Sequence, residues 1–283
     1  PQYNNGTVLS FIQDADFLLS SAKIPGTVWN DAMEGKRHPM REFEAGGANY
    51  FSTNVIAAKN FIDYLNNNED PRMATLFTGT KGAFYGDFDS KEDSDGNGTN
   101  DDKETYAKVR FTGDMDLVLM SDWEVNFYIA EVYTRASQNV QAQNYYKKGV
   151  TASLNQHGVT DADIIESGYA AWGTGTVEQN IKQIAMQKWV ANANYQHIES
   201  FLERNRTKYP SVNEIDIAAD RVAANSNFPA GDLTISVKGR ALLNGNLPAS
   251  PLYPSSYIFR NTNAPKQKAN VGEKVWWNVK AGK

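Results

Sequence analysis

The sequence predicts a mainly α-helical protein built on tetratricopeptide-like helical pairs, with long irregular loops and an irregular C-terminal tail. Apolar residues recur at helical spacing in several segments between residues 8 and 206. Polar, glycine-bearing stretches separate these segments, and glycine and proline recur after Val222. With 41% hydrophobic residues, the 283-residue chain can bury a sizeable core. We expect one domain over residues 1–283, with loop insertions at 79–105 and 159–175.

The N-terminal part predicts two helices. The first covers residues 8–19 and is followed by a Pro-Gly pair at 25–26, which stops helical structure. The second begins near Ser52 and Thr53, which are good N-caps, and ends at the asparagine run 66–68.

The central part predicts an antiparallel helical pair. Residues 121–136 and 140–156 each carry an apolar face, and a short break at 137–139 joins them. The pair is close in length to a tetratricopeptide unit of about 34 residues. Two more helices are expected, at 176–193 and 197–206.

Strand signals are few, and we expect short strands only at 107–111 and 233–237. No apolar run approaches the roughly 18–20 residues that span a bilayer. The net charge is −5 and no basic stripe is present, so nucleic acid is not expected as a partner. The absence of cysteine excludes disulfides and thiolate catalysis. The chain begins with Pro1 and shows no signal peptide, so we expect it to be part of a longer protein.

Four motifs in a fixed order carry a family resemblance over roughly residues 54–277. They are Asn67–Met73, Met120–Val132, the span from Ile184–Trp189 to Glu203–Pro210, and Leu252–Pro254 with Asn261 beyond. Their order and spacing, with the Trp276-Trp277 tail, resemble the SusD/RagB nutrient-binding proteins. The chain looks like the C-terminal part of such a protein, with its N-terminal portion missing.

The resemblance implies a non-catalytic cell-surface protein of the outer membrane. Such a protein is anchored by an N-terminal lipid that this chain lacks. It holds an oligosaccharide or other nutrient by aromatic stacking and delivers it to a SusC-like, TonB-dependent transporter.

A calcium-loop pattern, D-x-[DN]-x-[DN]-G-x5-E, spans residues 93–104. Calcium binds several hard oxygen ligands in a flexible shell. Glycine at position 98 permits the sharp turn, and the flanking segments do not predict the helices of a full EF-hand. A solvated, mobile loop is the alternative. We expect a structural calcium ion held by Asp93, Asp95, Asn97, Thr99 through its carbonyl, Asp101 and Glu104.

Glu124 and Glu131 lie two turns apart on one predicted helix. A pair of carboxylates can hydrolyse glycosidic bonds, but two turns of helix set them about 10.5 Å apart, at the loose end of the required range. We favour ion pairing with a neighbouring helix, through Arg204 or Arg206. No hydrolase or nucleotide-binding motif is present, and we expect no catalytic residues.

Aromatic side chains in loops are the candidate ligand-binding residues. Rings with polar neighbours stack on sugars, although each could instead pack under its own loop. The candidates are Trp29, Phe84, Tyr85, Tyr169 and Trp172. A tetratricopeptide-like scaffold that binds protein, and an α-helical glycoside hydrolase or lyase, are the alternative functions.

Overall fold

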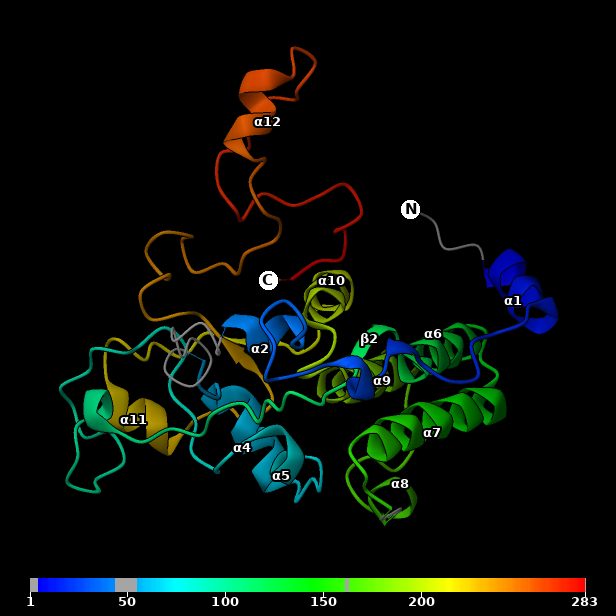
Figure 1. Ribbon diagram of the computed structural model, residues 1–283, viewed down its shortest axis with the longest axis horizontal. Helices are drawn as coiled ribbons and strands as arrows, with labels where there is room; N and C mark the ends of the chain where they lie inside the picture. Colours follow the sequence, from blue (N-terminus) through cyan, green and yellow to red (C-terminus); the bar gives the residue numbers. More distant parts are fainter. Residues whose placement is uncertain (1–4, 44–54, 161–162, 283) are drawn as a thin grey trace.

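The computed structural model describes residues 5–43, 55–160 and 163–282. It confirms the mainly α-helical fold, since the described residues contain only two small, two-stranded sheets (Figure 1). The helices are α1 (Asn5–Asp14), α2 (Pro39–Phe43), α4 (Lys59–Asn67), α5 (Met73–Leu76), α6 (Asp122–Arg135), α7 (Asn139–Gln156), α8 (Asp163–Glu166), α9 (Val177–Ala191), α10 (His197–Thr207), α11 (Arg221–Ser226) and α12 (Ser255–Arg260). Short 3-10 turns occur at Gly26–Val28 and Asp101–Lys103.

Helices α6 and α7 form the predicted pair and lie side by side (Figure 1). Helix α6 begins at the expected cap, because the Ser121 hydroxyl accepts the Glu124 N–H over 3.2 Å. The helices approach closely at Gly149, where a Cβ atom would lie 2.8 Å from the Phe127 ring. Helix α9 packs against both, and its Thr176 cap forms a capping box with Gln179. The core between them contains Trp123, Phe127, Ala130, Tyr146, Val150, Leu154 and Ile184.

Two further apolar clusters flank this core. One joins α4 and α5 to the end of α9 through Phe61, Leu65, Leu76 and Val190. The other packs α1 on α6. Helix α1 ends at Asp14, earlier than the predicted residue 19, and Phe17 and Leu18 instead pack as irregular chain against this cluster.

The sequence did not predict the antiparallel pair of β1 (Ala22–Ile24) and β2 (Leu117–Met120). Gly26 makes this approach possible, because a Cβ there would lie 1.7 Å from the Asp114 carbonyl oxygen. A parallel pair joins β3 (Val212–Asn213) to β4 (Leu233–Thr234). The strand expected at 233–237 is therefore present but short, and residues 107–111 form only isolated bridges.

The expected caps Ser52 and Thr53 lie outside the described residues, and α4 begins at Lys59. The C-terminal tail is largely irregular, as predicted, but it includes α11 and α12. Figure 1 shows α12 standing out from the body, and none of its residues is buried. Among the helices that the structure describes, none has the length and apolar character needed to cross a membrane.

Candidate functional site

The acidic loop of residues 93–104 is folded back on itself by its own side chains. The Asp93 carboxylate accepts the backbone N–H groups of Asn97 over 3.0 Å and of Gly98 over 2.8 Å. The Asp95 carboxylate accepts the backbone and side-chain N–H groups of Asn97, each over 3.1 Å. Gly98 has a φ of +88°, which glycine adopts without strain. The loop therefore makes a tight turn at the predicted glycine.

Lys81 brings a positive charge to the carboxylates of this loop. Its Nζ atom lies 2.5 Å from an Asp95 oxygen and 2.7 Å from Glu104 Oε1. The Asn97 side chain also donates to Glu104 Oε1, over 2.7 Å. Burial opposes the ammonium charge, but the hydrogen bonds to Asp95 and Glu104 outweigh it and raise the pKa of Lys81. The ammonium thus neutralises part of the negative charge that a calcium ion would otherwise neutralise.

Asp101 and Thr99, the other two predicted calcium ligands, are bonded within the loop. Both oxygens of the buried Asp101 carboxylate accept the Ser94 hydroxyl, over 3.0 and 2.9 Å. The Thr99 N–H donates to Asn97 Oδ1 over 2.8 Å. Within residues 5–43, 55–160 and 163–282, no three Asp, Glu or His side chains are arranged to hold a metal ion as they stand. The oxygen types fit calcium, but the loop is arranged around Lys81, and the calcium site stays a prediction.

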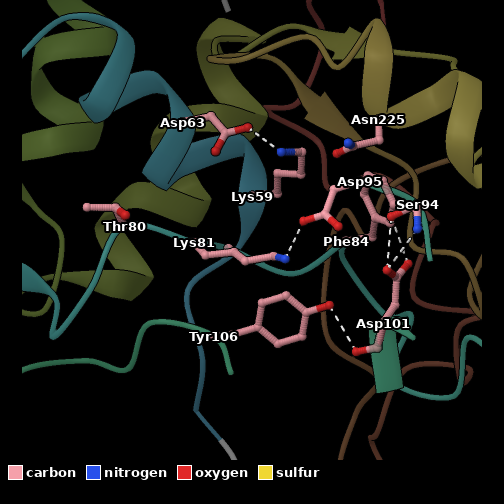
Figure 2. Close-up of a pocket in the computed structure, with 11 residues that line it drawn as sticks. Lys59, Asp63, Thr80, Lys81, Phe84, Ser94, Asp95, Asp101, Tyr106 and Asn225 are labelled. Carbon is pink, nitrogen blue, oxygen red and sulfur yellow. Dashed lines mark hydrogen bonds and ion pairs between the residues drawn. The ribbon is translucent and has the colours of Figure 1, made fainter. Parts of the chain in front are cut away.

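A polar cavity of about 230 Å³ adjoins this loop (Figure 2). Figure 2 shows Lys81 pointing toward Asp95 and the Tyr106 hydroxyl toward Asp101. The Tyr106 hydroxyl donates to the Asp101 carbonyl over 3.0 Å. On the opposite wall, Lys59 and Asp63 form an ion pair of 2.8 Å. The charged groups of the cavity are thus already committed to one another, which suits a structural role.

A second cavity, of about 370 Å³, is lined by four aromatic side chains among the residues that the structure describes, and we call it the aromatic groove. Tyr85 is 53% exposed, whereas Phe61 and Trp189 meet edge to face with centroids 4.7 Å apart. The lining consists of Ala58, Asn60, Phe61, Tyr85, Trp189, Ser200, Phe201, Arg204, Asn205, Pro210, Leu233, Thr234, Leu247 and Pro248. Aromatic surface thus alternates with amide, hydroxyl and guanidinium groups in one open groove.

Helix α10 supplies the polar wall of the groove. Ser200, Phe201, Arg204 and Asn205 lie on one face because the helical repeat aligns residues four positions apart. The Asn205 side chain is fixed, since its Nδ2 donates to the Phe201 carbonyl over 3.1 Å. Arg204 is only 7% exposed, and this burial lowers its pKa to about 10, so it remains a cation at neutral pH.

Of the five predicted ligand-binding aromatics, the structure brings Tyr85 alone to the aromatic groove. The other four pack against the body, which is the alternative role that the sequence left open. Trp29 donates its indole N–H to the Met115 carbonyl over 3.1 Å, and Tyr169 donates its hydroxyl to the buried Asp70. The Phe84 ring lies tilted against that of Phe228 with centroids 5.5 Å apart, and the Trp172 ring lies 5.0 Å from that of Tyr146.

Sequence reasoning missed most of the groove. Trp189 has the helical spacing of a core residue, and Phe61 likewise belongs to an apolar helix face. One signal was available: Phe201 is an aromatic residue on a helix rich in charged and amide side chains, and it is 36% exposed. An aromatic ring beside an arginine and an asparagine is typical of the lining of small-ligand sites.

Glu124 and Glu131 take part in ion pairs, as the favoured interpretation predicted. Arg206 donates to both Glu131 oxygens, over 2.7 and 2.5 Å, and Arg135 donates to Oε1 over 2.6 Å. Burial opposes ionisation of Glu131, but Arg206 outweighs it and lowers the pKa to about 2. Glu124 accepts from Gln196 over 2.9 Å and pairs with the buried Lys188 over 3.2 Å. An arginine-bound carboxylate of this kind does not suit a general acid.

Comparison with known proteins places this geometry in a family. A sequence model of a family described as "Starch-binding associating with outer membrane" matches residues 27–229, which is more than half of the chain. None of the curated proteins compared with the chain shows detectable similarity to it.

Solved structures of SusD homologues share the fold. A homologue from Bacteroides thetaiotaomicron is 21% identical with a TM-score of 0.57, over 83% of this chain and 55% of its own. Another, from Bacteroides fragilis, is 15% identical with a TM-score of 0.60, over 97% of this chain and 61% of its own. A third, from Bacteroides uniformis, is 18% identical with a TM-score of 0.54, over 92% of this chain and 56% of its own. The chain therefore spans less than two thirds of each of these structures.

Proposed function

The chain belongs to the SusD-like family, described as starch-binding and associating with the outer membrane, and from this premise we propose that it binds oligosaccharide in the aromatic groove without cleaving it. The observation that carries the proposal is the convergence of Tyr85, Phe61, Trp189 and Phe201 with polar side chains on one open surface. The C–H faces of sugar rings stack on aromatic rings, and sugar hydroxyls bond to amide and hydroxyl groups. The volume of about 370 Å³ lies within the range of small-ligand sites, about 300–1,000 Å³.

We propose further that the whole protein is a lipid-anchored, outward-facing protein that delivers its ligand to a TonB-dependent transporter. The family's association with the outer membrane supports this, as does the resemblance of the motifs to SusD/RagB proteins. Co-purification of the full-length protein with a TonB-dependent transporter barrel tests the partner. Recovery of the full-length protein without any barrel under mild detergent would contradict it.

The binding proposal is tested on a glycan array followed by calorimetry. We expect binding without release of reducing ends, and we expect Tyr85→Ala to weaken it by about tenfold or more because the stacking surface is lost. Phe259→Ala is the matched control, since Phe259 is an aromatic residue on α12 that is 86% exposed and lies outside the groove. Equal weakening by both substitutions would count against the groove, and release of sugar would favour a hydrolase or lyase.

A structural calcium ion in the 93–104 loop is a second proposal. It is supported by the complete match to the calcium-loop pattern and by the turn at Gly98 that gathers Asp93, Asp95, Asn97 and Glu104. Binding would require the Lys81 ammonium to leave Asp95 and Glu104, because two cations cannot share those oxygens without strong repulsion. Calcium would then hold the wall of the polar cavity in shape.

Peptide binding is the other candidate function, and one observation favours it. A groove of about 1,120 Å³ runs between residues 15–19 and the α6–α7 pair, and it has both polar and apolar lining residues. Helical-pair surfaces bind peptides in such grooves. Substitution of Tyr145, which lines this groove, would weaken the binding of a protein partner but not the binding of an oligosaccharide.

A further inference from the structure

The C-terminal tail returns to α10, the helix that supplies the polar wall of the aromatic groove (Figure 1). Lys280 donates to the Thr207 carbonyl at the end of this helix over 2.7 Å. Among the described residues 251–282, Asn278 is the one that is buried, with an exposed fraction of 4%. It lies between Lys208, which ends α10, and Asn205, which lines the groove. A side chain of the tail therefore contacts a residue of the groove wall.

Three hydrogen bonds run through these side chains in one direction, and we call Lys208, Asn278 and Asn205 the amide relay. The Lys208 ammonium donates to Asn278 Oδ1 over 2.6 Å. The Asn278 Nδ2 atom donates to Asn205 Oδ1 over 3.2 Å, and Asn205 Nδ2 donates to the Phe201 carbonyl over 3.1 Å. Lys208 is 7% exposed and Asn205 is 2% exposed. Burial strengthens these bonds and makes an unpaired amide group in the relay costly.

The ammonium at the start of the amide relay determines which way both amides face. An amide has an acceptor end and a donor end, and turning it over exchanges them. An ammonium only donates, so Asn278 must turn its oxygen to Lys208 and its NH₂ group to Asn205. Asn205 must then turn its oxygen to Asn278, and its NH₂ group has one N–H beyond the one bonded to Phe201.

Lys208 occupies its position at a cost in both backbone conformation and charge. Its φ is +66°, a left-handed conformation in which helix ends commonly place glycine because a Cβ atom is strained there. Burial, and then repulsion by Lys274, Arg204 and Lys280, lowers the pKa of Lys208 to about 8. The carboxylate of Glu178 faces Lys280. Glycine would end the helix without either cost, which indicates that the ammonium is needed as a donor to Asn278.

We propose that Lys208 and Asn278 are positioning residues for the aromatic groove, because the amide relay sets Asn205 as a hydrogen-bond donor to the bound oligosaccharide. The inference rests on the proposed oligosaccharide-binding function and adds that the ligand places an acceptor oxygen at Asn205. Neither positioning residue is among the described residues that line the groove, so each acts through Asn205. The C-terminal tail is thereby part of the binding site, although Asn278 is 73 positions away from Asn205 in the sequence.

The first test turns the amide relay around. Asn278→Asp keeps an oxygen for Lys208 but has no N–H for Asn205, so Asn205 must place its oxygen where its NH₂ group was. The probes are maltoheptaose, xylohexaose and mannohexaose, titrated by calorimetry. We expect the affinity for the probe that binds to fall about five- to tenfold, as the loss of a hydrogen bond to a ligand predicts. Asn270→Asp is the matched control, because it adds the same charge at an exposed asparagine of the tail outside the relay. It should leave the affinity within about twofold.

The second test separates positioning from a purely structural role. Asn205→Ala removes the donor itself, so adding Asn278→Asp to it should weaken binding no further. Equal weakening by Asn278→Asp in the wild type and in Asn205→Ala would overturn the inference, because the tail would then act through another contact. Unchanged affinity in Asn278→Asp would overturn it as well.

The pH dependence of binding tests the relay without altering it. The pKa of Lys208 is lowered from 10.5 to about 8, so its ammonium is present below that pH and is lost as pH rises through it. A neutral amine accepts as well as donates, and it no longer fixes the orientation of Asn278. We expect the wild-type affinity to fall severalfold between about pH 7 and pH 9.5, and the residual binding of Asn205→Ala to stay constant. Constant wild-type affinity would overturn the inference, and this profile decides if Asn278→Asp does not fold.

Failure of the proposed function gives a different result from failure of the inference. Binding of none of the probes, nor of any glycan on the array, would overturn both. If a probe binds and Tyr85→Ala weakens it while Asn278→Asp does not, the aromatic groove stands and the amide relay alone is overturned.

Discussion

Arg206 and Glu131 form a two-pronged ion pair that ties α10 to α6 across 75 positions of the sequence. The two guanidinium nitrogens donate to the two carboxylate oxygens over 2.7 and 2.5 Å, and Glu203 accepts from the same guanidinium over 2.7 Å. This contact fixes the orientation of α10. Arg204, which lies close to Arg206 on the same helix, lines the aromatic groove. A structural ion pair and a candidate binding residue therefore stand side by side on one helix.

Loss of this ion pair should destabilise the protein strongly. Arg206→Ala leaves the buried Glu131 with Arg135 as its remaining arginine partner, so we expect the free energy of unfolding to fall by about 3 kcal/mol. Urea denaturation of the wild type and the variant measures this change in the free energy of unfolding. Lys147→Ala is the control, because Lys147 pairs with the largely exposed Glu166, and its loss should cost less than about 1 kcal/mol. Similar costs for both substitutions would contradict the structural role of Arg206.

The same carboxylate should make stability depend on pH in the acid range. The pKa of Glu131 is lowered from 4.5 to about 2 in the folded protein. A depressed pKa means that the stabilisation is complete above the unfolded value of 4.5 and is lost as pH falls toward about 2. Unfolding of the wild type and of Glu131→Gln, measured over this window, should show their difference shrinking with falling pH. A constant difference would rule out this linkage.

Close packing of α6 on α7 gives a third prediction. Gly149→Ala would place a methyl group 2.8 Å from the Phe127 ring, which is itself fully buried. Although alanine favours helix more than glycine does, overpacking should prevail and cost about 1–3 kcal/mol. Gly173→Ala is the matched control, because its Cβ would meet Gln183 at an ordinary 3.7 Å. Thermal unfolding should show a lower midpoint for the first substitution and little change for the second.

These contacts show which parts of the protein can be predicted from sequence. The α6–α7 pair follows from local periodicity and the Ser121 cap, so its bounds were predicted to within about one residue. The pairing of β1 with β2 joins positions 93 or more apart and depends on Gly26 meeting Asp114, which no local pattern encodes. Likewise, Arg204 and Arg206 were equal candidates for Glu131, and the pitch of α10 decides between them.

Most of the aromatic groove could not be predicted from the sequence, for a similar reason. Its walls come from residues near 58–61, 85, 189, 200–210, 233–234 and 247–248, and only folding brings these together. Tyr85 was predicted because loop position and aromatic character are both visible in the sequence. Trp189 was missed because its helical spacing is that of a core residue. In the structure its ring packs against Phe61 and also lines the groove.

The last prediction concerns the calcium affinity of the 93–104 loop, which depends on Lys81. Because the Lys81 ammonium lies 2.5 Å from Asp95 and 2.7 Å from Glu104, it competes with calcium for those oxygens. Lys81→Met should therefore tighten calcium binding, measured by calorimetry, and enlarge the rise in unfolding temperature that millimolar calcium produces. Lys91→Met removes the same charge from a lysine that pairs with Asp102, outside the predicted ligand set, and should change calcium affinity much less. Tightening by both substitutions alike would indicate a general charge effect. The absence of heat and thermal shift in all three proteins, Lys81→Met included, would contradict the calcium site.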